Sequence, residues 1–168
     1  QTEQFDSLFW KSSPYGWPVI GWPSDLEGIT REEASSFFNL YYAPNNLTAA
    51  LVGNFDPARV RELAERYFGR IQRGKRPVPD VVTLEEKQLA EKRMNAECDC
   101  QPQVAIQFHA VPFGHKDSYA LAVVSGLLNG QTGRLNKSLV LDQKIAASAA
   151  AYPNAQRYAG SFGVFAET

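Results

Sequence analysis

Apolar side chains recur at helical spacing in three stretches of the chain. Within residues 34–41 they fall at i, i+3, i+4 and i+7, and residues 60–67 repeat this spacing. Residues 1–12 show a shorter version of the same pattern. The pattern predicts three amphipathic helices, each with one face turned toward other parts of the protein.

The ends of the two longer helices are marked by residues with specific capping roles. Thr30 followed by Glu33 predicts a capping box, in which each side chain satisfies a free backbone N–H at the helix start. Asp56 is an N-cap directly before a proline, and Gly69 ends that helix. Pro44 stops the first helix, because proline disfavours helical geometry in the residue before it.

Strands are predicted where apolar and polar residues alternate, or where a short run is compatible with β-structure. Residues 93–98 alternate with a period of two, which is typical of a half-buried strand, and residues 104–110 predict a second one. Residues 147–153 and 160–167 predict two strands near the end of the chain. Residues 47–52 form a short β-compatible run.

Two further helices and two connecting segments complete the picture. Residues 119–128 are apolar on nearly every side, which predicts a buried helix, and residues 134–141 predict another helix. Residues 13–28 are punctuated by proline and glycine and predict a loop, whereas residues 70–83 form a basic, proline-bearing linker. The order of elements predicts an α+β fold, with mixed or antiparallel sheets and helices packed on one face.

Composition changes this picture only slightly. The 168 residues are 44% hydrophobic and 21% charged, with a formal net charge of -1, which is typical of a globular domain and does not favour a nucleic-acid partner. No apolar run approaches the roughly 18 to 20 residues that a membrane-spanning helix needs. The chain starts at Gln1 without a methionine and ends in a strand-like run, so we expect it to be an excised fragment.

Few residues are suited to hold a metal, namely Cys98, Cys100, His109 and His115. No acidic residue lies between the two histidines, so they do not form the inverted zinc motif H-x-x-E-H, and the cysteine spacing does not match a zinc knuckle. A disulfide between cysteines two residues apart is expected to be strained. We therefore predict buried cysteines that act as small hydrophobic residues, surface histidines and no metal site.

Other kinds of site are weakly supported. The motif G-x-S-x-G is absent, and neither histidine lies in a pattern that demands a catalytic triad. The glycines of residues 126–133 predict a helix cap and a turn, because the P-loop lysine is missing. Trp17 and Trp22 lie in a loop that is predicted to pack over its own core. A small-molecule-binding α+β domain that uses this loop is the least favoured reading.

Several short motifs are more specific than any of these patterns. The strongest are Pro14-Tyr15-Gly16-x-Pro18-Val19-Ile20-Gly21-Trp22, Ile29-Thr30, Tyr42-Ala43-Pro44-Asn45-Asn46 and Val52-Gly53-x-Phe55-Asp56-Pro57. Weaker support comes from Asp117-x-Tyr119-Ala120-Leu121, Gly133-Arg134-Leu135 and Gly163-Val164-Phe165-Ala166. With these motifs, nearly the whole chain resembles the pitrilysin/insulinase family of zinc metallopeptidases, in particular bacterial members related to mitochondrial processing peptidase.

The resemblance implies an architecture of repeated α+β halves that enclose a peptide-binding chamber. Residues 1–72 would be the C-terminal part of the first peptidase-like half, residues 73–83 a linker, and residues 84–168 the N-terminal part of the second, inactive half. The zinc ligands and the general base of the family lie upstream of the Pro-Tyr-Gly motif. Zinc is therefore expected in the parent protein upstream of Gln1, and neither a catalytic residue nor a metal ligand is expected in this chain.

The resemblance also bears on substrate binding. The family pattern Leu-Arg-…-Leu-x-Tyr, which holds substrate, aligns with residues 139–147, where Val140 and Ala147 take the places of the arginine and the tyrosine. The substrate-binding residues are therefore unknown, and a partner subunit would supply those groups. Residues 129–133 align with the glycine-rich substrate loop of the noncatalytic subunit of processing peptidase, but the segment is short and is assigned no binding role.

The sequence thus predicts a noncatalytic fragment of a zinc metalloendopeptidase, inactive by itself, that helps to form a peptide-binding chamber. The alternative is a fragment of a zinc-less scaffold or partner subunit of the same family, acting in protein–protein assembly. Expected partners are the other half of the parent protein, a homologous partner subunit and the parent's peptide substrate. The compartment is unknown; for a bacterial parent, a periplasmic or secreted location fits.

Overall fold

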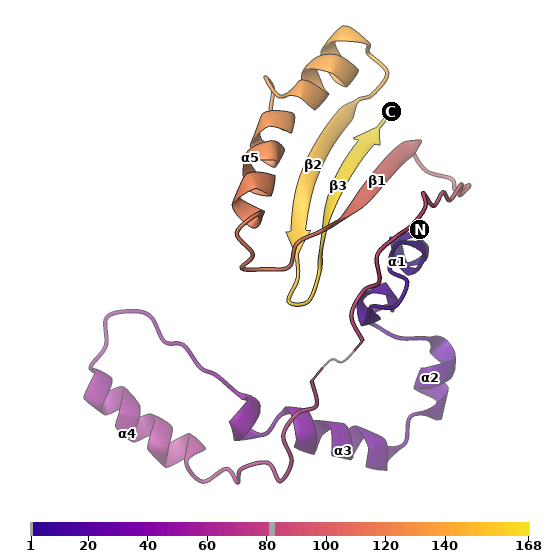
Figure 1. Cartoon of the computed structure of the whole chain (residues 1–168). Coiled ribbons are helices and arrows are strands. Elements are labelled where there is room, and N and C mark those ends of the chain that lie inside the picture. The colour runs from indigo at the N-terminus through magenta and orange to yellow at the C-terminus, as the bar shows by residue number, and fades with distance from the viewer. Residues whose placement is uncertain (1, 81–82) are drawn as a thin grey trace. The chain divides into compact units, whose positions relative to one another are not determined.

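The computed structural model describes residues 2–80 and 83–168 of the chain. The chain forms two compact units, which are drawn in Figure 1. The first unit combines Gln1–Pro18 with Thr83–Thr168, and the second unit is Val19–Val82. The chain therefore leaves the first unit after residue 18 and returns to it at residue 83. The division into two peptidase-like halves with a linker at residues 73–83 stays a prediction.

The first unit is built on a three-stranded antiparallel sheet. Its elements are α1 (Thr2–Phe9), η1 (Pro14–Gly16), β1 (Gln103–Ala110), α5 (Ser118–Leu128), η3 (Asn136–Asp142), β2 (Ser148–Ala155) and β3 (Gly160–Glu167). The central strand is β3, which lies between β1 and β2, and α5 packs along β2 (Figure 1). The predicted α+β fold is confirmed, as are the three strands after residue 102.

The register of the sheet separates its two faces. Phe162 of β3 lies opposite Phe108 of β1 and Pro153 of β2. Because side chains alternate along a strand, His109 and its partner Ser161 belong to the opposite face of the sheet. This alternation decides which residues of β1 are available to α1.

Asn129, the residue after α5, fastens that helix to the outer edge of the sheet. Its carboxamide oxygen accepts a hydrogen bond from the backbone N–H of Ala151 (2.7 Å), and its nitrogen donates to the carbonyl of Ala151 (2.6 Å). The Ser125 hydroxyl donates to the same carbonyl at 2.8 Å. A side-chain amide thus takes the place of a neighbouring strand at the edge of β2. Gly130 follows with φ 82°, which is compatible with the predicted turn.

The second unit consists of helices joined by loops. Its elements are α2 (Pro23–Gly28), α3 (Arg31–Tyr41), η2 (Pro44–Asn46) and α4 (Pro57–Phe68). The predicted capping box is present, since the Thr30 hydroxyl accepts from the N–H of Glu33 (3.2 Å) and the Glu33 carboxylate accepts from the N–H of Thr30 (2.9 Å). Asp56 caps α4 through the N–H of Ala58 at 2.9 Å. The predicted starts of both helices are therefore confirmed.

Two predicted strands are wrong. Residues 93–98 and residues 47–52 form no strand in the described part of the chain. The segment before β1 instead runs beside α1, where the Lys92 ammonium donates to the carbonyls of Leu8 (2.7 Å) and Phe9 (3.4 Å). Residues 47–52 belong to a unit without a described strand, so their backbone has no strand partner.

Two further predictions need correction. Residues 13–28 are not entirely loop, because they contain η1 and the short helix α2. The helix α5 is present as expected but is not buried, since Tyr119, Val123 and Leu127 remain exposed. Its apolar composition predicts neighbours on more than one side, whereas β2 is the main described element against which it packs.

Candidate functional site

The four residues considered for metal binding do not come together. No group of three or more His, Cys, Asp or Glu side chains that could hold a metal occurs among the described residues. Cys98 and Cys100 are exposed and joined in a disulfide, so the prediction of buried cysteines is wrong and their sulfurs are not thiolates. His115 accepts a hydrogen bond from the N–H of Asp117 at 3.1 Å. These residues do not fit a zinc site, and no zinc chemistry is assigned to them.

A different cluster joins the two ends of the first unit where the chain leaves and re-enters it. We call residues 11–13 and 84–86 the clasp. The Glu85 carboxylate accepts hydrogen bonds from three consecutive backbone N–H groups, those of Lys11 (2.8 Å), Ser12 (3.1 Å) and Ser13 (2.9 Å). Three amides that converge on one carboxylate form a cradle for negative charge.

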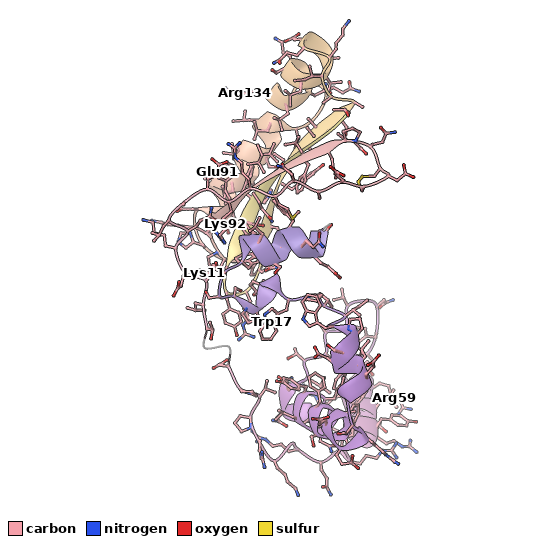
Figure 2. All side chains as sticks on the ribbon, turned by 90° about the vertical axis from the view of Figure 1, so that its right-hand side faces the viewer. Lys11, Trp17, Arg59, Glu91, Lys92 and Arg134 are labelled. Carbon is pink, nitrogen blue, oxygen red and sulfur yellow. A yellow bond between two sulfur atoms is a disulfide. The ribbon has the colours of Figure 1, made fainter. Side chains whose placement is uncertain are left out.

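Side-chain contacts between the two segments of the clasp add to these backbone hydrogen bonds. The Ser12 hydroxyl donates to the carbonyl of Leu84 (2.8 Å) and accepts from the N–H of Glu86 (3.0 Å). The Lys11 ammonium pairs with the Glu86 carboxylate, and both groups are exposed. Figure 2 labels Lys11 beside α1, together with Lys92, which contacts the carbonyl end of the same helix. The clasp therefore ties residues that are more than seventy positions apart in the sequence.

The clasp shifts the ionisation of its carboxylate. Partial burial raises the pKa of Glu85, but the hydrogen bonds from the backbone N–H groups of Lys11, Ser13 and Ser12 outweigh this effect. The nearby His109 adds a smaller effect in the same direction as the hydrogen bonds. The net result is a lowered pKa, so the carboxylate that the cradle needs is favoured over the neutral acid.

An aromatic cluster continues the clasp toward the sheet. The ring of His109 stacks on Phe9 with a centroid distance of 4.0 Å and an interplanar angle of 17°, and Trp10 meets it edge-on at 5.3 Å. Tyr15 packs against Trp10 at 5.6 Å and accepts a hydrogen bond from the N–H of Tyr158 at 3.3 Å. Residues from α1, η1, β1 and the β2–β3 loop thus share one cluster.

His109 occupies an unusual position in this cluster. Both of its ring nitrogens are inaccessible to solvent and have no hydrogen-bond partner among the described residues. Burial lowers the pKa of His109, Glu85 raises it and Lys92 lowers it, and the net effect is a lowered pKa. The prediction of a surface histidine is wrong for His109, because its place on β1 turns it toward α1.

The sequence singles out His109 and Tyr15 for other reasons, but it does not single out Trp10, Lys11 or Glu85, which also form this site. Trp10 is only 6% exposed, whereas Trp17 is 74% and Trp22 52% exposed, so the prediction that the loop of Trp17 and Trp22 packs over its own core is wrong. The family motif Pro14-Tyr15-Gly16 forms η1, and a Cβ atom at Gly16 would lie 3.1 Å from the Cβ of Trp10. The motif itself was the one available signal, since it marks the close approach of the chain to Trp10.

The two segments that align with substrate-binding parts of the family, residues 139–147 and 129–133, lie outside the clasp and the aromatic cluster. Val140 is part of η3, and the N–H of Ala147 donates to the carbonyl of Glu167 at 2.7 Å. Residues 129–133 begin with Asn129, whose side chain bonds the backbone of β2. These positions do not identify substrate-binding residues, which stay unknown. The clasp pairs no nucleophile with a base, and its geometry is suited to holding chain segments together rather than to catalysis.

Comparisons of the sequence and of the structure with known proteins point to the same family. The sequence profile of the family described as "Peptidase M16 inactive domain" matches residues 28–168. The zinc protease PqqE of Helicobacter pylori is 31% identical over 140 residues, which cover 81% of this chain and 32% of that protein. A solved structure of a protease from Helicobacter pylori has a TM-score of 0.88 at 26% identity, over 98% of this chain and 41% of the other.

A second solved structure agrees in fold. The peptidase M16 inactive domain from Pseudomonas fluorescens has a TM-score of 0.86 at 16% identity, over 99% of this chain and 40% of the other. At this identity the likeness concerns the fold alone. The chain spans between 32% and 41% of the length of these three relatives.

Proposed function

Because the chain belongs to the Peptidase M16 inactive-domain family, we propose that it is a noncatalytic part of a zinc metalloendopeptidase and helps to enclose a peptide-binding chamber. The observation that carries the proposal is the family match over residues 28–168. The similarity to a protein named as a zinc protease supports it. On this proposal the zinc and the general base belong to the part of the parent protein upstream of Gln1.

On this proposal the chain forms a rigid part of the wall of the peptide-binding chamber. The clasp fixes α1 to the segment before β1, and Asn129 fixes α5 to β2. A wall that is held by hydrogen bonds between distant segments keeps its shape when a peptide binds, which limits the entropy lost on binding. The proposal therefore assigns the clasp and Asn129 a structural part in peptide binding.

The exposed apolar residues of the first unit are assigned to contacts with the other half of the parent protein. Val104, Ile106 and Phe108 lie on one face of β1 and remain exposed, as does Tyr119 of α5. Large exposed apolar patches mark interaction sites in soluble proteins. A homologous partner subunit is a further proposed occupant. For a bacterial parent we propose a periplasmic or secreted location.

A complementation experiment tests the proposal. This chain and the remainder of the parent are produced as separate polypeptides, and hydrolysis of a quenched fluorescent peptide is followed with each alone and with both together. We expect no hydrolysis and no stoichiometric zinc for this chain alone, and activity of the mixture above that of the remainder alone. Hydrolysis or stoichiometric zinc with this chain alone overturns the noncatalytic role, and equal rates with and without the chain overturn the chamber role.

The zinc-less scaffold alternative makes a different prediction for the same parent. If the coding sequence upstream of Gln1 lacks H-x-x-E-H and the complete parent binds no zinc in elemental analysis, the scaffold role replaces the peptidase role. An intact motif together with zinc in the complete parent supports the peptidase role.

A further inference from the structure

The clasp and the aromatic cluster around His109 adjoin each other: the clasp holds residues 11–13 against residues 84–86, and the aromatic cluster holds Phe9 and Trp10 against His109 of β1. The chain leaves the first unit only a few residues later, after residue 18, and re-enters it at residue 83, next to the clasp. We propose that these contacts form an acid-released fastening, in which protonation of His109 detaches α1 from β1 and loosens the clasp. The inference goes beyond the proposed function and does not depend on a peptide chamber.

The geometry of His109 makes its neutral ring part of the contact. A protonated imidazole carries two N–H donors, and the described structure offers neither nitrogen an acceptor. One face of the ring is covered by Phe9 at 4.0 Å, and Trp10 meets its edge. Buried donors without acceptors are costly, so adding the second proton favours a conformation in which α1 no longer covers the ring.

The charged groups around His109 come mainly from the segment before β1. Glu85 favours the protonated ring and Lys92 opposes it. Glu91 and His109 both line a cavity of about 340 Å³, and the Glu91 side chain is largely exposed. From α1, the carbonyls of Leu8 and Phe9 face this region, but they already accept from Lys92.

The remaining neighbours on β1 and β3 carry no charge. The Ser161 hydroxyl, opposite His109, accepts a hydrogen bond from the Gln107 carboxamide at 3.0 Å. Gln107 also leaves its side-chain oxygen buried and without a partner among the described residues. No titratable side chain of these two strands compensates a charge on His109 in the described structure.

Glu85 couples the histidine to the clasp. Its carboxylate favours the protonated ring, yet it is held by the N–H groups of Lys11, Ser12 and Ser13. If Glu85 turned toward a protonated His109, these three N–H groups would lose their acceptor. If it stayed in place, the charged ring would stay unpaired. Either arrangement weakens the contact, so one proton loosens both the clasp and the aromatic cluster.

Trp10 offers a direct readout of the release. In the complete chain, Trp17→Phe and Trp22→Phe leave Trp10 as the single tryptophan, and acrylamide quenching of its fluorescence is measured between pH 8 and pH 5. We expect strong protection at pH 8, a one-proton transition below pH 6.5 and quenching at pH 5 close to that of an exposed tryptophan. Far-ultraviolet circular dichroism is expected to lose no more than the small helical signal of α1, because a detached eight-residue helix is marginal in water while the sheet and the other helices remain folded.

Two histidine variants and an NMR titration of His109 test whether this histidine causes the transition. His109→Phe keeps a flat ring for Phe9 to pack on and is expected to abolish the transition, whereas His115→Asn is expected to leave it unchanged. In the chain that keeps both histidines, the pH midpoint of the His109 ring resonance in NMR is expected to equal the pH midpoint at which Trp10 loses its protection. A transition that persists in His109→Phe, a different midpoint, a loss of the β-sheet or of most of the circular dichroism signal at the same pH, or Trp10 protection that survives at pH 5 each overturns the proposal.

Discussion

Replacement of Glu85 by glutamine tests whether the clasp stabilises the first unit. The carboxylate accepts three backbone N–H groups, with one oxygen serving Ser12 and Ser13 and the other serving Lys11. In Glu85→Gln the amide oxygen keeps the first two bonds, but the new NH₂ group faces the N–H of Lys11. The variant therefore loses one acceptor and the negative charge, while the volume of the side chain is unchanged.

The magnitude follows from the exposure of these bonds. A hydrogen bond to a charged group contributes about 1.5–3 kcal/mol, and a neutral one about 1 kcal/mol, when it is shielded from water. The bonds from Ser12 and Ser13 are only partly buried and that from Lys11 is exposed, so solvent reduces their contribution. We expect Glu85→Gln to lower the free energy of unfolding by about 1–2 kcal/mol, and Glu85→Ala by about 2–3 kcal/mol.

Urea unfolding followed by Trp10 fluorescence, again with Trp17 and Trp22 replaced by phenylalanine, measures this change in the first unit. With a slope near 2 kcal/mol per molar urea, the midpoint is expected to fall by about 0.5–1 M for Glu85→Gln. Glu86→Gln is the matched control, since its exposed pair with Lys11 is expected to contribute little. Unchanged midpoints for both Glu85 variants would refute the view that the clasp stabilises the unit.

The remaining predictions concern the sheet edge, a helix cap and pH. Asn129→Ala leaves the N–H and carbonyl of Ala151 without the side-chain partner and is expected to destabilise the first unit by about 2–3 kcal/mol in urea unfolding. Thr30→Ala removes the N-cap of α3 and is expected to lower helix content and cost about 1 kcal/mol, measured by circular dichroism. Because burial lowers the pKa of His109, the stability of the first unit is expected to be constant above its ordinary value of 6.5 and to fall below it. Because the backbone hydrogen bonds outweigh burial and lower the pKa of Glu85, its contribution is lost only below its ordinary value of 4.5.

Matched variants distinguish these effects from general damage. Asn136→Ala removes an exposed side-chain bond to a backbone carbonyl and is expected to change stability far less than Asn129→Ala. Thr48→Ala lies outside any helix and is expected to leave helix content unchanged. His109→Phe should flatten the fall of stability below pH 6.5. Equal losses for the two asparagine variants, a helix loss with Thr48→Ala, or an unaltered pH profile with His109→Phe would contradict the respective prediction.

Several elements were predictable because their signals are local. The capping box of Thr30 and Glu33 and the Asp56 N-cap act within four residues, so a short stretch of sequence contains both partners. The strands β2 and β3 follow from short runs near the end of the chain, and their antiparallel pairing needs only the loop between them. The family motifs are predictable for a related reason, since they are short segments with a fixed order.

Other predictions failed because a local sequence pattern does not show which distant segment packs against it. Residues 93–98 alternate as a strand should, yet they run beside α1 and leave β1 paired with β3 alone in the described sheet. The apolar sequence of α5 predicts burial, but the described chain covers it mainly from the side of β2. A period reveals which side of a segment is apolar, and the partner for that side lies elsewhere in the molecule.

The clasp and its histidine were decided by the tertiary structure. Lys11 and Glu85 are 74 residues apart, and Phe9 meets His109 only because β1 turns that ring toward α1. Capping and periodicity are properties of neighbouring residues, so the sequence alone predicts most helices, the strands β1, β2 and β3, and the family. The pKa of a buried ring and the charge cradle of Glu85 depend on burial and on contacts between distant segments, and these arise only when the chain has folded.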